Sequence, residues 1–404
     1  MRTISCNAGR RSALDILEAM KTCACGYDLG RPSRRDFLAA GSGLLIGTRA
    51  IAADAPLVVG QSAPLTGDYA PATRELNAGL QLSLDRINAG GGIGGRRVEL
   101  RSRDDGYVPQ RTIENTRAFI ESPDVVALAA YRGTPNIEAC FDTLTAAGIA
   151  LIGPQSGAAS MYDPHHRLVF PARASYRAEV ERIVSHASVI GFQRVGVLWV
   201  GSAFGADVRD AARASLKAHG MGLVVEASYP RTTADVQGAV TAIAGASPQT
   251  VIIAAAADGA EAFIKAMRQR LPSCTFYLVS NVSQANFSRN MAAGEGSMPM
   301  VCQVFPHPQS MLPLMQRFRE DLAHARAPAT VSSYAVIEGY VIGSLLARAL
   351  AMAGPQPTRE HVAHALAGRD IDIGGIAFSY PLAGYVGSRF TELTMVSRDG
   401  TFIH

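Results

Sequence analysis

Short apolar segments alternate with longer segments of helical periodicity along most of the chain. The first apolar segment is Leu57–Gly60, and Leu76, Leu80, Leu84 and Ile87 then recur at the spacing of one helix face. The same alternation continues to about residue 270. Strands separated by helices of this length build parallel sheets with helices on both faces, so the pattern predicts an α/β fold.

The pattern also predicts where the other elements lie. Further strands are expected at 97–101, 125–130, 149–152, 195–200, 224–229 and 251–255, and near 378, 393–396 and 401–403. Further helices are expected at 137–147, 178–190, 206–219, 236–244, 260–270 and 334–352. Because 404 residues exceed the roughly 250–300 that one hydrophobic core serves, we expect two lobes. No linker separates them, so the chain should pass between the lobes several times.

Residues 1–52 have the features of an export signal. Arg34 and Arg35 precede a stretch rich in Gly and Ala, and Ala50-Ile51-Ala52 offers small residues at a cleavage site. The segment around the two arginines resembles the twin-arginine motif, which predicts export to the periplasm. A retained membrane anchor is the alternative, but glycines interrupt the apolar stretch, which is shorter than the roughly 20 residues that span a bilayer.

Charge and cysteine content change once this segment is set aside. Residues 1–52 hold eight of the 38 basic and four of the 34 acidic side chains, which leaves 30 of each in the remainder. A neutral chain has no electrostatic attraction for nucleic acid. The remainder keeps Cys140, Cys274 and Cys302, and this odd number excludes a complete disulfide framework. Either a Cys274–Cys302 bridge or three buried thiols are expected.

Three loops after predicted strands could bind a small anion. In open α/β sheets, ligands bind beyond the carboxyl ends of the strands. The loop after the first strand ends at Tyr69, and the loops after the third and fourth strands contain Gly133-Thr134 and Ser156-Gly157. Glycines, hydroxyl groups and the start of a helix suit a carboxylate. A plain helix cap or turn is the alternative for each hydroxyl.

The other motifs do not support catalysis, a metal site or a nucleotide site. Gly90–Gly95 fits a dinucleotide-binding pattern, but it follows a helix and precedes a strand, which is the reverse of the required order. Asp104 and Asp105 are adjacent, so their side chains diverge in an extended segment and a turn or cap role is expected. His165 and His166 lack further ligands at useful spacing, which favours a surface loop. We therefore expect a binding protein, not an enzyme, without metal or cofactor.

Several segments taken together resemble one family. They are Ser62-Ala63-Pro64-Leu65-Thr66-Gly67, Asp85–Gly95, Arg103-Asp104-Asp105-Gly106-Tyr107, Leu151-Ile152-Gly153-Pro154, Phe170-Pro171-Ala172-Arg173 and Glu338-Gly339-Tyr340. The chain resembles the leucine/isoleucine/valine-binding family, the periplasmic receptors of branched-chain amino acid ABC transporters, over nearly all of residues 55–404. The resemblance is specific for the family and not for the ligand.

This resemblance implies a type I periplasmic-binding fold with two lobes and three hinge crossovers. The first lobe would hold about 55–174 and 306–375, and the second about 175–303 and 376–404. A small ligand, either an amino acid or a related carboxylate or amide, would bind between the lobes as they close. The closed form would then dock on an ABC permease in the inner membrane. A periplasmic ligand sensor of a signalling system is the alternative.

The family also implies which residues contact the ligand. Its members hold the ligand carboxylate on the first lobe, in the loops that here carry Gly133-Thr134 and Ser156-Gly157. The positions that match on the second lobe are Tyr176, Phe204, Asp258 and Asn281.

Two departures from the family pattern bear on the ligand. Tyr131-Arg132 stand where many relatives carry Gly-Pro, so Arg132 could add a positive charge beside an anion. Amino-acid-specific members often place an acid near position 281 for the ammonium group, whereas Asn281 stands here and Asp258 is the one evident substitute. An amide, a short aliphatic acid or an aromatic acid therefore remains open as the ligand.

Overall fold

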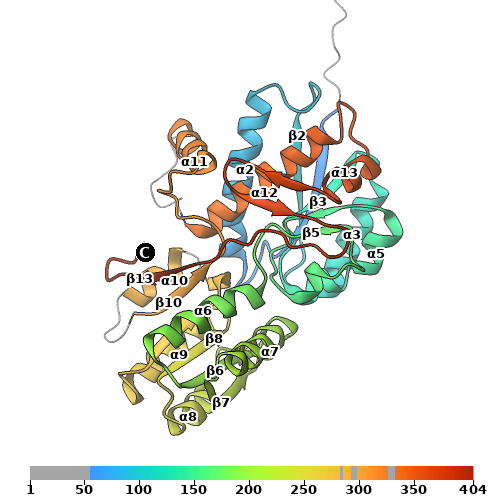
Figure 1. Cartoon of the computed structure of the whole chain (residues 1–404). Helices are drawn as coiled ribbons and strands as arrows, with labels where there is room; N and C mark the ends of the chain where they lie inside the picture. The colour runs from blue at the N-terminus through green and yellow to red at the C-terminus, as the bar shows by residue number, and fades with distance from the viewer. Residues whose placement is uncertain (1–54, 283–284, 293–297, 326–332, 404) are drawn as a thin grey trace, which may run out of the picture. The chain divides into compact units, whose positions relative to one another are not determined.

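The computed structural model describes residues 55–282, 285–292, 298–325 and 333–403, and residues 53–404 form one compact unit (Figure 1). The predicted export signal at 1–52 lies outside the described residues. Two sheets organise the compact unit, and we call each sheet, with the helices that cover it, a lobe.

Lobe 1 is built on a parallel sheet of five strands in the order β2-β1-β3-β4-β5. These strands are β1 (Leu57–Ala63), β2 (Val98–Asp104), β3 (Val125–Ala129), β4 (Leu151–Ile152) and β5 (Val169–Phe170). Successive side chains of a strand point to opposite faces. Val59 therefore packs in one core with α2 (Ala70–Ala89) and α12 (Tyr334–Met352). Val58 packs in another core with α3 (Pro109–Glu121) and α5 (Phe141–Ala147), so helices cover both faces.

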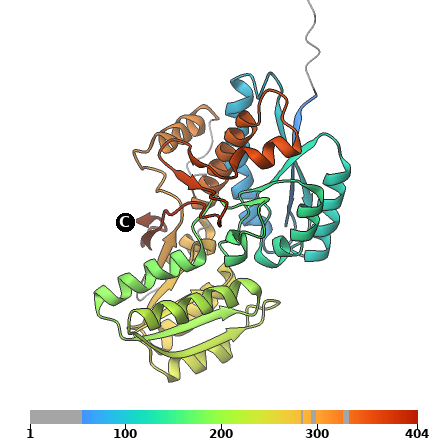
Figure 2. The same ribbon diagram turned by 45° about the vertical axis from the view of Figure 1, so that its right-hand side comes forward.

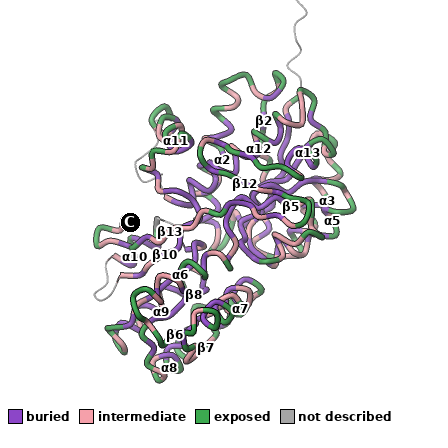
Figure 3. The backbone as a smooth tube through the Cα atoms, in the orientation of Figure 1, coloured by how far each residue is buried: buried purple, intermediate pink, exposed green. Residues whose placement is uncertain are grey.

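Glycine allows the backbones of α2 and α12 to approach closely. A Cβ on Gly339 would lie 1.9 Å from the carbonyl oxygen of Leu76, and one on Gly79 would lie 1.8 Å from that of Val336. Among the described residues, α12 is the one helix long and apolar enough to cross a membrane. Most of α12 is instead buried in the lobe 1 core (Figure 3).

The other elements of lobe 1 lie around this frame. They are α4 (Thr134–Glu138), the 3-10 helix η1 (Ala159–Tyr162), α11 (Pro313–His324), α13 (Arg359–Leu366) and an antiparallel pair formed by β11 (Asp370–Asp372) and β12 (Ala377–Ser379). Phe378 of β12 belongs to the same hydrophobic core as α2 and α12.

Lobe 2 is built on a sheet of seven strands in the order β14-β13-β10-β9-β8-β6-β7. Its parallel strands are β6 (Arg194–Val200), β7 (Gly222–Tyr229), β8 (Thr250–Ala254), β9 (Thr275–Leu278) and β10 (Met300–Gln303), and its antiparallel edge is β13 (Glu392–Val396) and β14 (Phe402–Ile403). Its helices are α6 (Tyr176–Ile190), α7 (Ala203–Ala218), α8 (Gln237–Gly245), α9 (Ala257–Arg270), α10 (Ala285–Ala292) and the short 3-10 helix η2 (Ser280–Val282). Helices α6 and α7 pack together against this sheet (green in Figure 2), as do α8 and α9.

The chain passes between the lobes three times. It leaves lobe 1 after β5 and enters α6, and it returns after β10 toward α11. The third passage follows Tyr385, which still packs in the lobe 1 core, and precedes β13. The predicted α/β architecture with two lobes and three crossovers is therefore confirmed.

The structure differs from the sequence pattern in several places. The helix expected at 137–147 is two helices, α4 and α5, which are separated at Ala139 and Cys140. The two strands at the edge of lobe 2, β13 and β14, lie where strands were expected near 393–396 and 401–403, but their antiparallel direction was not predicted. Strands β9 and β10 were also not predicted, because each has only four residues and shows no periodicity. Helices α3, α10, α11 and α13 were likewise missed.

The motifs set aside as structural do have structural roles. The Asp104 carboxylate accepts hydrogen bonds from the Thr66 hydroxyl and from the backbone N–H groups of Leu65, Thr66 and Gly106. Burial raises the pKa of Asp104, but these bonds outweigh it and lower the pKa to about 2. Gly90–Gly95 forms the turn between α2 and β2. Among the described residues, the three cysteines are buried and form no disulfide.

Candidate functional site

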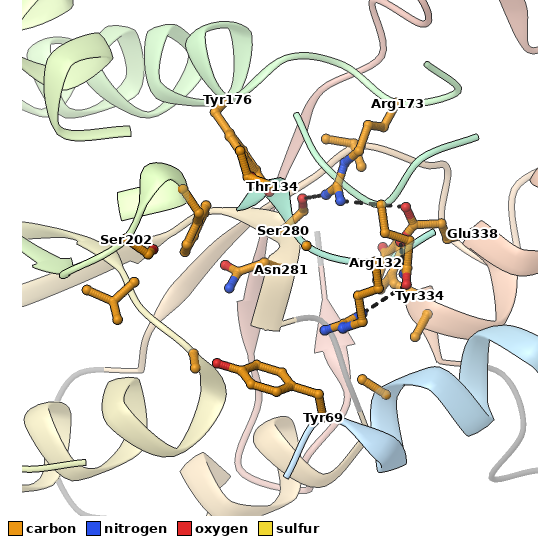
Figure 4. A pocket seen from close by; sticks show the side chains of 18 of the residues that line it. Tyr69, Arg132, Thr134, Arg173, Tyr176, Ser202, Ser280, Asn281, Tyr334 and Glu338 are labelled. Atoms are coloured by element: carbon orange, nitrogen blue, oxygen red, sulfur yellow. Dashed lines mark hydrogen bonds and ion pairs between the residues drawn. The ribbon is translucent and has the colours of Figure 1, made fainter. Parts of the chain in front are cut away.

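The carboxyl ends of the parallel strands of both lobes face one cavity (Figure 4). Tyr69 follows β1, Arg132 follows β3, Ser202 follows β6 and Asn281 follows β9. The cavity holds about 820 Å³ of empty space, part of which opens to solvent. Its wall consists of Tyr69, Ala72, Tyr107, Arg132, Gly133, Thr134, Gln155, Arg173, Tyr176, Val200, Ser202, Phe204, Arg231, Ala256, Ser280, Asn281, Gln303, Val304, Phe305, Tyr334, Ala335 and Glu338.

A tight turn presents Thr134 to the cavity. Gly133 has a φ of 94°, which L side chains rarely adopt, and a Cβ there would lie 2.6 Å from the Tyr107 ring. The Thr134 Oγ1 forms a 2.8 Å hydrogen bond with the Ser156 Oγ. Ser156 also accepts a hydrogen bond of 3.2 Å from the backbone N–H of Ala158. Ser156 is thus a buried support behind Thr134.

Aromatic side chains from both lobes form the apolar part of the wall. The rings of Tyr69 and Tyr107 stack with centroids 4.0 Å apart, and those of Tyr176 and Phe204 meet edge to face at 5.0 Å. Burial raises the pKa of Tyr69 and of Tyr107, so both hydroxyls remain protonated donors at neutral pH. Such a wall suits a ligand with an apolar body.

Two guanidinium groups give the cavity a positive character. The Arg132 Nη1 donates a hydrogen bond of 3.0 Å to the Gln155 Oε1, and the Arg231 guanidinium lies 5.7 Å from the centre of the Tyr107 ring. Within the described part of the chain, neither arginine has a carboxylate oxygen within 4 Å. Arginine beside hydroxyl donors is a typical arrangement for binding a carboxylate.

A third arginine is almost wholly buried and bridges the lobes. Arg173, whose side chain is 4% exposed, follows β5 on the first passage between the lobes. Its guanidinium donates to the Ser280 Oγ and lies 3.5 Å from Glu338 of α12 and 3.8 Å from Glu179 of α6. The Arg173 Nε is buried and has no hydrogen-bond partner in the described part of the chain.

Glu179 holds the lobe 2 end of this cluster. Its side chain is fully buried and accepts hydrogen bonds from the backbone N–H of Ser280 at 2.6 Å and from the Ser280 Oγ at 3.0 Å. Burial raises the pKa of Glu179 to about 7, although Arg173 and the two bonds from Ser280 oppose that rise. Desolvation therefore outweighs the favourable contacts of this carboxylate.

A second hollow adjoins the cavity and is acidic. It shares Tyr69, Arg132, Arg231, Ala256 and Asn281 with the cavity wall. The acids that line it are Asp68, Asp258 and Glu261. Asp258 lies in the first turn of α9, is exposed, and lines this outer hollow and not the inner cavity.

The structure therefore separates the residues expected to bind the ligand. Six of them line the inner cavity: Tyr69, Gly133, Thr134, Tyr176, Phe204 and Asn281. Three do not: Ser156 lies behind Thr134, Asp258 faces the outer hollow, and Gly157 is a buried backbone position. The carbonyl of Gly157 accepts a 2.7 Å hydrogen bond from the backbone N–H of Tyr176. A Cβ at Gly157 would lie 2.9 Å from that nitrogen, so glycine lets the loop approach α6.

Sequence reasoning missed several polar residues of the wall. Arg173 and Glu338 stand in segments that carried the family resemblance, but no ligand role had been assigned to them. Gln155 and Ser280 directly precede predicted site residues in the sequence, and their position in loops after strands was the available signal. The pairing of Arg173 with Glu338 joins residues 165 positions apart, which no local pattern can reveal.

Comparison with known proteins agrees with this architecture. The chain is similar to a substrate-binding periplasmic protein from Ralstonia solanacearum, with 34% identity and a TM-score of 0.79 over 86% of this chain and 99% of the other. It is also similar in fold to a solute-binding protein of an ABC transporter from R. palustris in complex with benzoate, with 19% identity and a TM-score of 0.73 over 86% of this chain and 95% of the other.

Curated relatives match over a shorter region. An amino acid binding protein from Pseudomonas aeruginosa is 23% identical over 236 residues, which are 58% of this chain and 62% of that protein. The chain thus spans less than two thirds of the length of these curated relatives. The sequence model of the family described as periplasmic binding protein matches residues 56–394. With its two-lobed type I fold, this chain belongs to the periplasmic binding protein family.

Proposed function

We propose that this protein is the solute-binding component of an ABC importer and that it holds a small carboxylate or related amide in the cavity between its lobes. The observation that carries the proposal is the composition of the cavity wall, in which hydroxyl donors and two arginines, Arg132 and Arg231, lie beside aromatic rings from both lobes, and neither arginine has a carboxylate partner among the described residues. The match to the periplasmic binding protein family supports the importer role, as does the similarity in fold to the solute-binding protein of an ABC transporter from R. palustris.

The wall suggests how such a ligand would lie. Its carboxylate would sit near Arg132 and Thr134 on lobe 1, where a charge and a hydroxyl are available together. Its apolar body would lie between the stacked tyrosines of lobe 1 and the Tyr176–Phe204 pair of lobe 2. Both lobes would then contact one molecule, which is the condition for a ligand to favour a closed state.

The energies are of the right size for hinge closure. Moving an open-to-closed equilibrium from 1:99 to 99:1 requires about 5.5 kcal/mol of differential binding. Hydrogen bonds to a charged group contribute about 1.5–3 kcal/mol each, so two of them with aromatic contacts from the second lobe would suffice.

A binding screen tests the proposal. The purified protein is heated with amino acids, amides, aliphatic acids and aromatic acids, and each compound that raises the melting temperature is titrated by calorimetry. A ligand at 100 times its dissociation constant should stabilise the folded state by about 2.7 kcal/mol and bind one molecule per chain. If a well-folded preparation binds none of these carboxylates or amides, the proposal is wrong.

A further inference from the structure

Among the described residues, the inner cavity has a single carboxylate in its wall. That carboxylate belongs to Glu338 of α12, whose side chain is 11% exposed. An α-amino acid presents a carboxylate and an ammonium group, and a buried ammonium needs an anion or several acceptors to replace its hydration. Whether this site can take an amino acid therefore depends on whether Glu338 is available.

Glu338 is already engaged on both oxygens. Its Oε1 lies 3.5 Å from the Arg173 Nη1, and its Oε2 accepts a hydrogen bond of 3.3 Å from the Gln155 Nε2. Gln155 is in turn held by the 3.0 Å bond from Arg132. Figure 4 shows this series of contacts running along one side of the cavity, from Arg132 to Glu338 and Arg173.

Arg173 is held in place from the other lobe. Ser280 accepts from its guanidinium, and Glu179, fully buried in lobe 2, lies 3.8 Å away. With its side chain 4% exposed, Arg173 has almost no room to swing away and release Glu338 to a ligand. Its remaining Nε–H is a buried donor without a partner among the described residues, and a donor offers nothing to a ligand cation.

The acids of the outer hollow do not substitute for Glu338. Asp68 and Asp258 line that hollow without lining the inner cavity, and Glu261 accepts hydrogen bonds of 3.0 and 3.1 Å from the Asn290 amide. An ammonium group inside the cavity would instead face Arg132, Arg173 and Arg231.

Besides the Arg173 Nε, two buried polar atoms of wall residues have no hydrogen-bond partner within the described residues, namely the Asn281 Oδ1 and the Tyr334 hydroxyl. The Nδ2 of Asn281 donates to the Ala255 carbonyl at 2.8 Å. A neutral amide oxygen matches a hydroxyl or an amide N–H better than it matches an ammonium, which it cannot neutralise.

We infer that Arg173 sets the charge selectivity of the cavity by occupying Glu338, so that the ligand is a small carboxylate without an ammonium group, bearing a hydrogen or a hydroxyl in its place. This inference rests on the proposed function and narrows its ligand class. Arg173 acts here as a positioning residue, because it excludes the amino acid through Glu338.

Matched acids test the inference in the wild-type protein. L-Phenylalanine, 3-phenylpropanoate and 2-hydroxy-3-phenylpropanoate differ only at the α-substituent, as do L-leucine, 4-methylpentanoate and 2-hydroxy-4-methylpentanoate. In calorimetric titrations, the amino acid of the set that binds should be at least about tenfold weaker than its hydrogen or hydroxyl counterpart. Equal or tighter binding of the amino acid overturns the inference and leaves the receptor function standing. If no member of the wider carboxylate and amide screen binds, the proposed function fails and the inference fails with it.

A double variant tests the role of Arg173 itself. At pH 8, above the pKa of about 7 that burial gives Glu179, Arg173→Gln with Glu179→Gln removes one charge of each sign, so it frees Glu338 without adding net charge to the buried cluster. The ratio of amino acid affinity to hydroxy acid affinity should rise at least about tenfold in this variant. The single variant Glu179→Gln keeps the Arg173–Glu338 pair and should keep the wild-type preference. An unchanged ratio in a folded double variant overturns the role of Arg173. If the double variant does not fold, the wild-type series above still decides whether the cavity excludes amino acids.

Discussion

Replacing Arg132 with Met should weaken carboxylate binding while largely sparing the uncharged analogue. Met keeps part of the apolar stem of Arg132 and removes its charge and its donors. Arg132 is half-buried, its one hydrogen bond within the described residues goes to Gln155, and it lines the cavity without an acidic partner within 4 Å. A hydrogen bond to a charged group contributes about 1.5–3 kcal/mol, and partial exposure places Arg132 near the lower value. The dissociation constant for a carboxylate should therefore rise by about tenfold.

The assay is calorimetric titration of wild type and variant with one carboxylate and its primary amide. The amide should lose less than about threefold, because it has no charge to pair with the guanidinium. Arg97→Met is a matched control, because Arg97 is exposed and lies outside the cavity wall, and it should leave both affinities unchanged. Equal losses for the acid and the amide in Arg132→Met would refute the electrostatic role of Arg132.

Four further substitutions have definite expected outcomes. Thr134→Val should weaken carboxylate binding by roughly tenfold with little change in stability. Ser156→Ala should lower the free energy of unfolding by about 1–2 kcal/mol and weaken binding less than Thr134→Val does. Calorimetric titration measures the effect of each variant on affinity, and urea unfolding measures its effect on stability. Because burial raises the pKa of Glu179 to about 7 in the folded state, its contribution to stability should decrease as the pH rises from about 4.5 to about 7, by up to about 3 kcal/mol. Glu179→Gln should remove this dependence from urea midpoints measured at pH 5 and pH 8, and an unaltered difference would contradict the assignment. Gly339→Ala should destabilise by about 1–3 kcal/mol, because its Cβ would lie 1.9 Å from a carbonyl oxygen of α2, while Gly245→Ala, with open space around its Cβ, should not destabilise.

The order of strands and helices could be predicted because it depends on local patterns. Helix α2 shows this, because the apolar positions that predicted it, among them Leu76, Leu80 and Leu84, are buried on one face of the helix in the structure. The prediction that loops after parallel strands would form the site followed from topology, and Thr134 and Asn281 do line the cavity.

What could not be predicted depends on side-chain direction and on contacts distant in sequence. Asp258 stands in a suitable loop, yet the turn of α9 that begins there exposes its carboxylate to the outer hollow. Ser156 and Thr134 look alike in sequence, and their mutual hydrogen bond decides which of them forms the wall. The charged pair of Arg173 and Glu338 forms only when the first passage meets α12.

Small-angle X-ray scattering with and without a bound ligand tests the central claim most directly. The account holds that one small carboxylate contacts both lobes and favours their closed arrangement. The radius of gyration should therefore fall when the best ligand of the screen is added at saturation, and this change should follow the binding isotherm. A radius of gyration that stays constant while calorimetry shows full occupancy would contradict hinge closure as the mechanism.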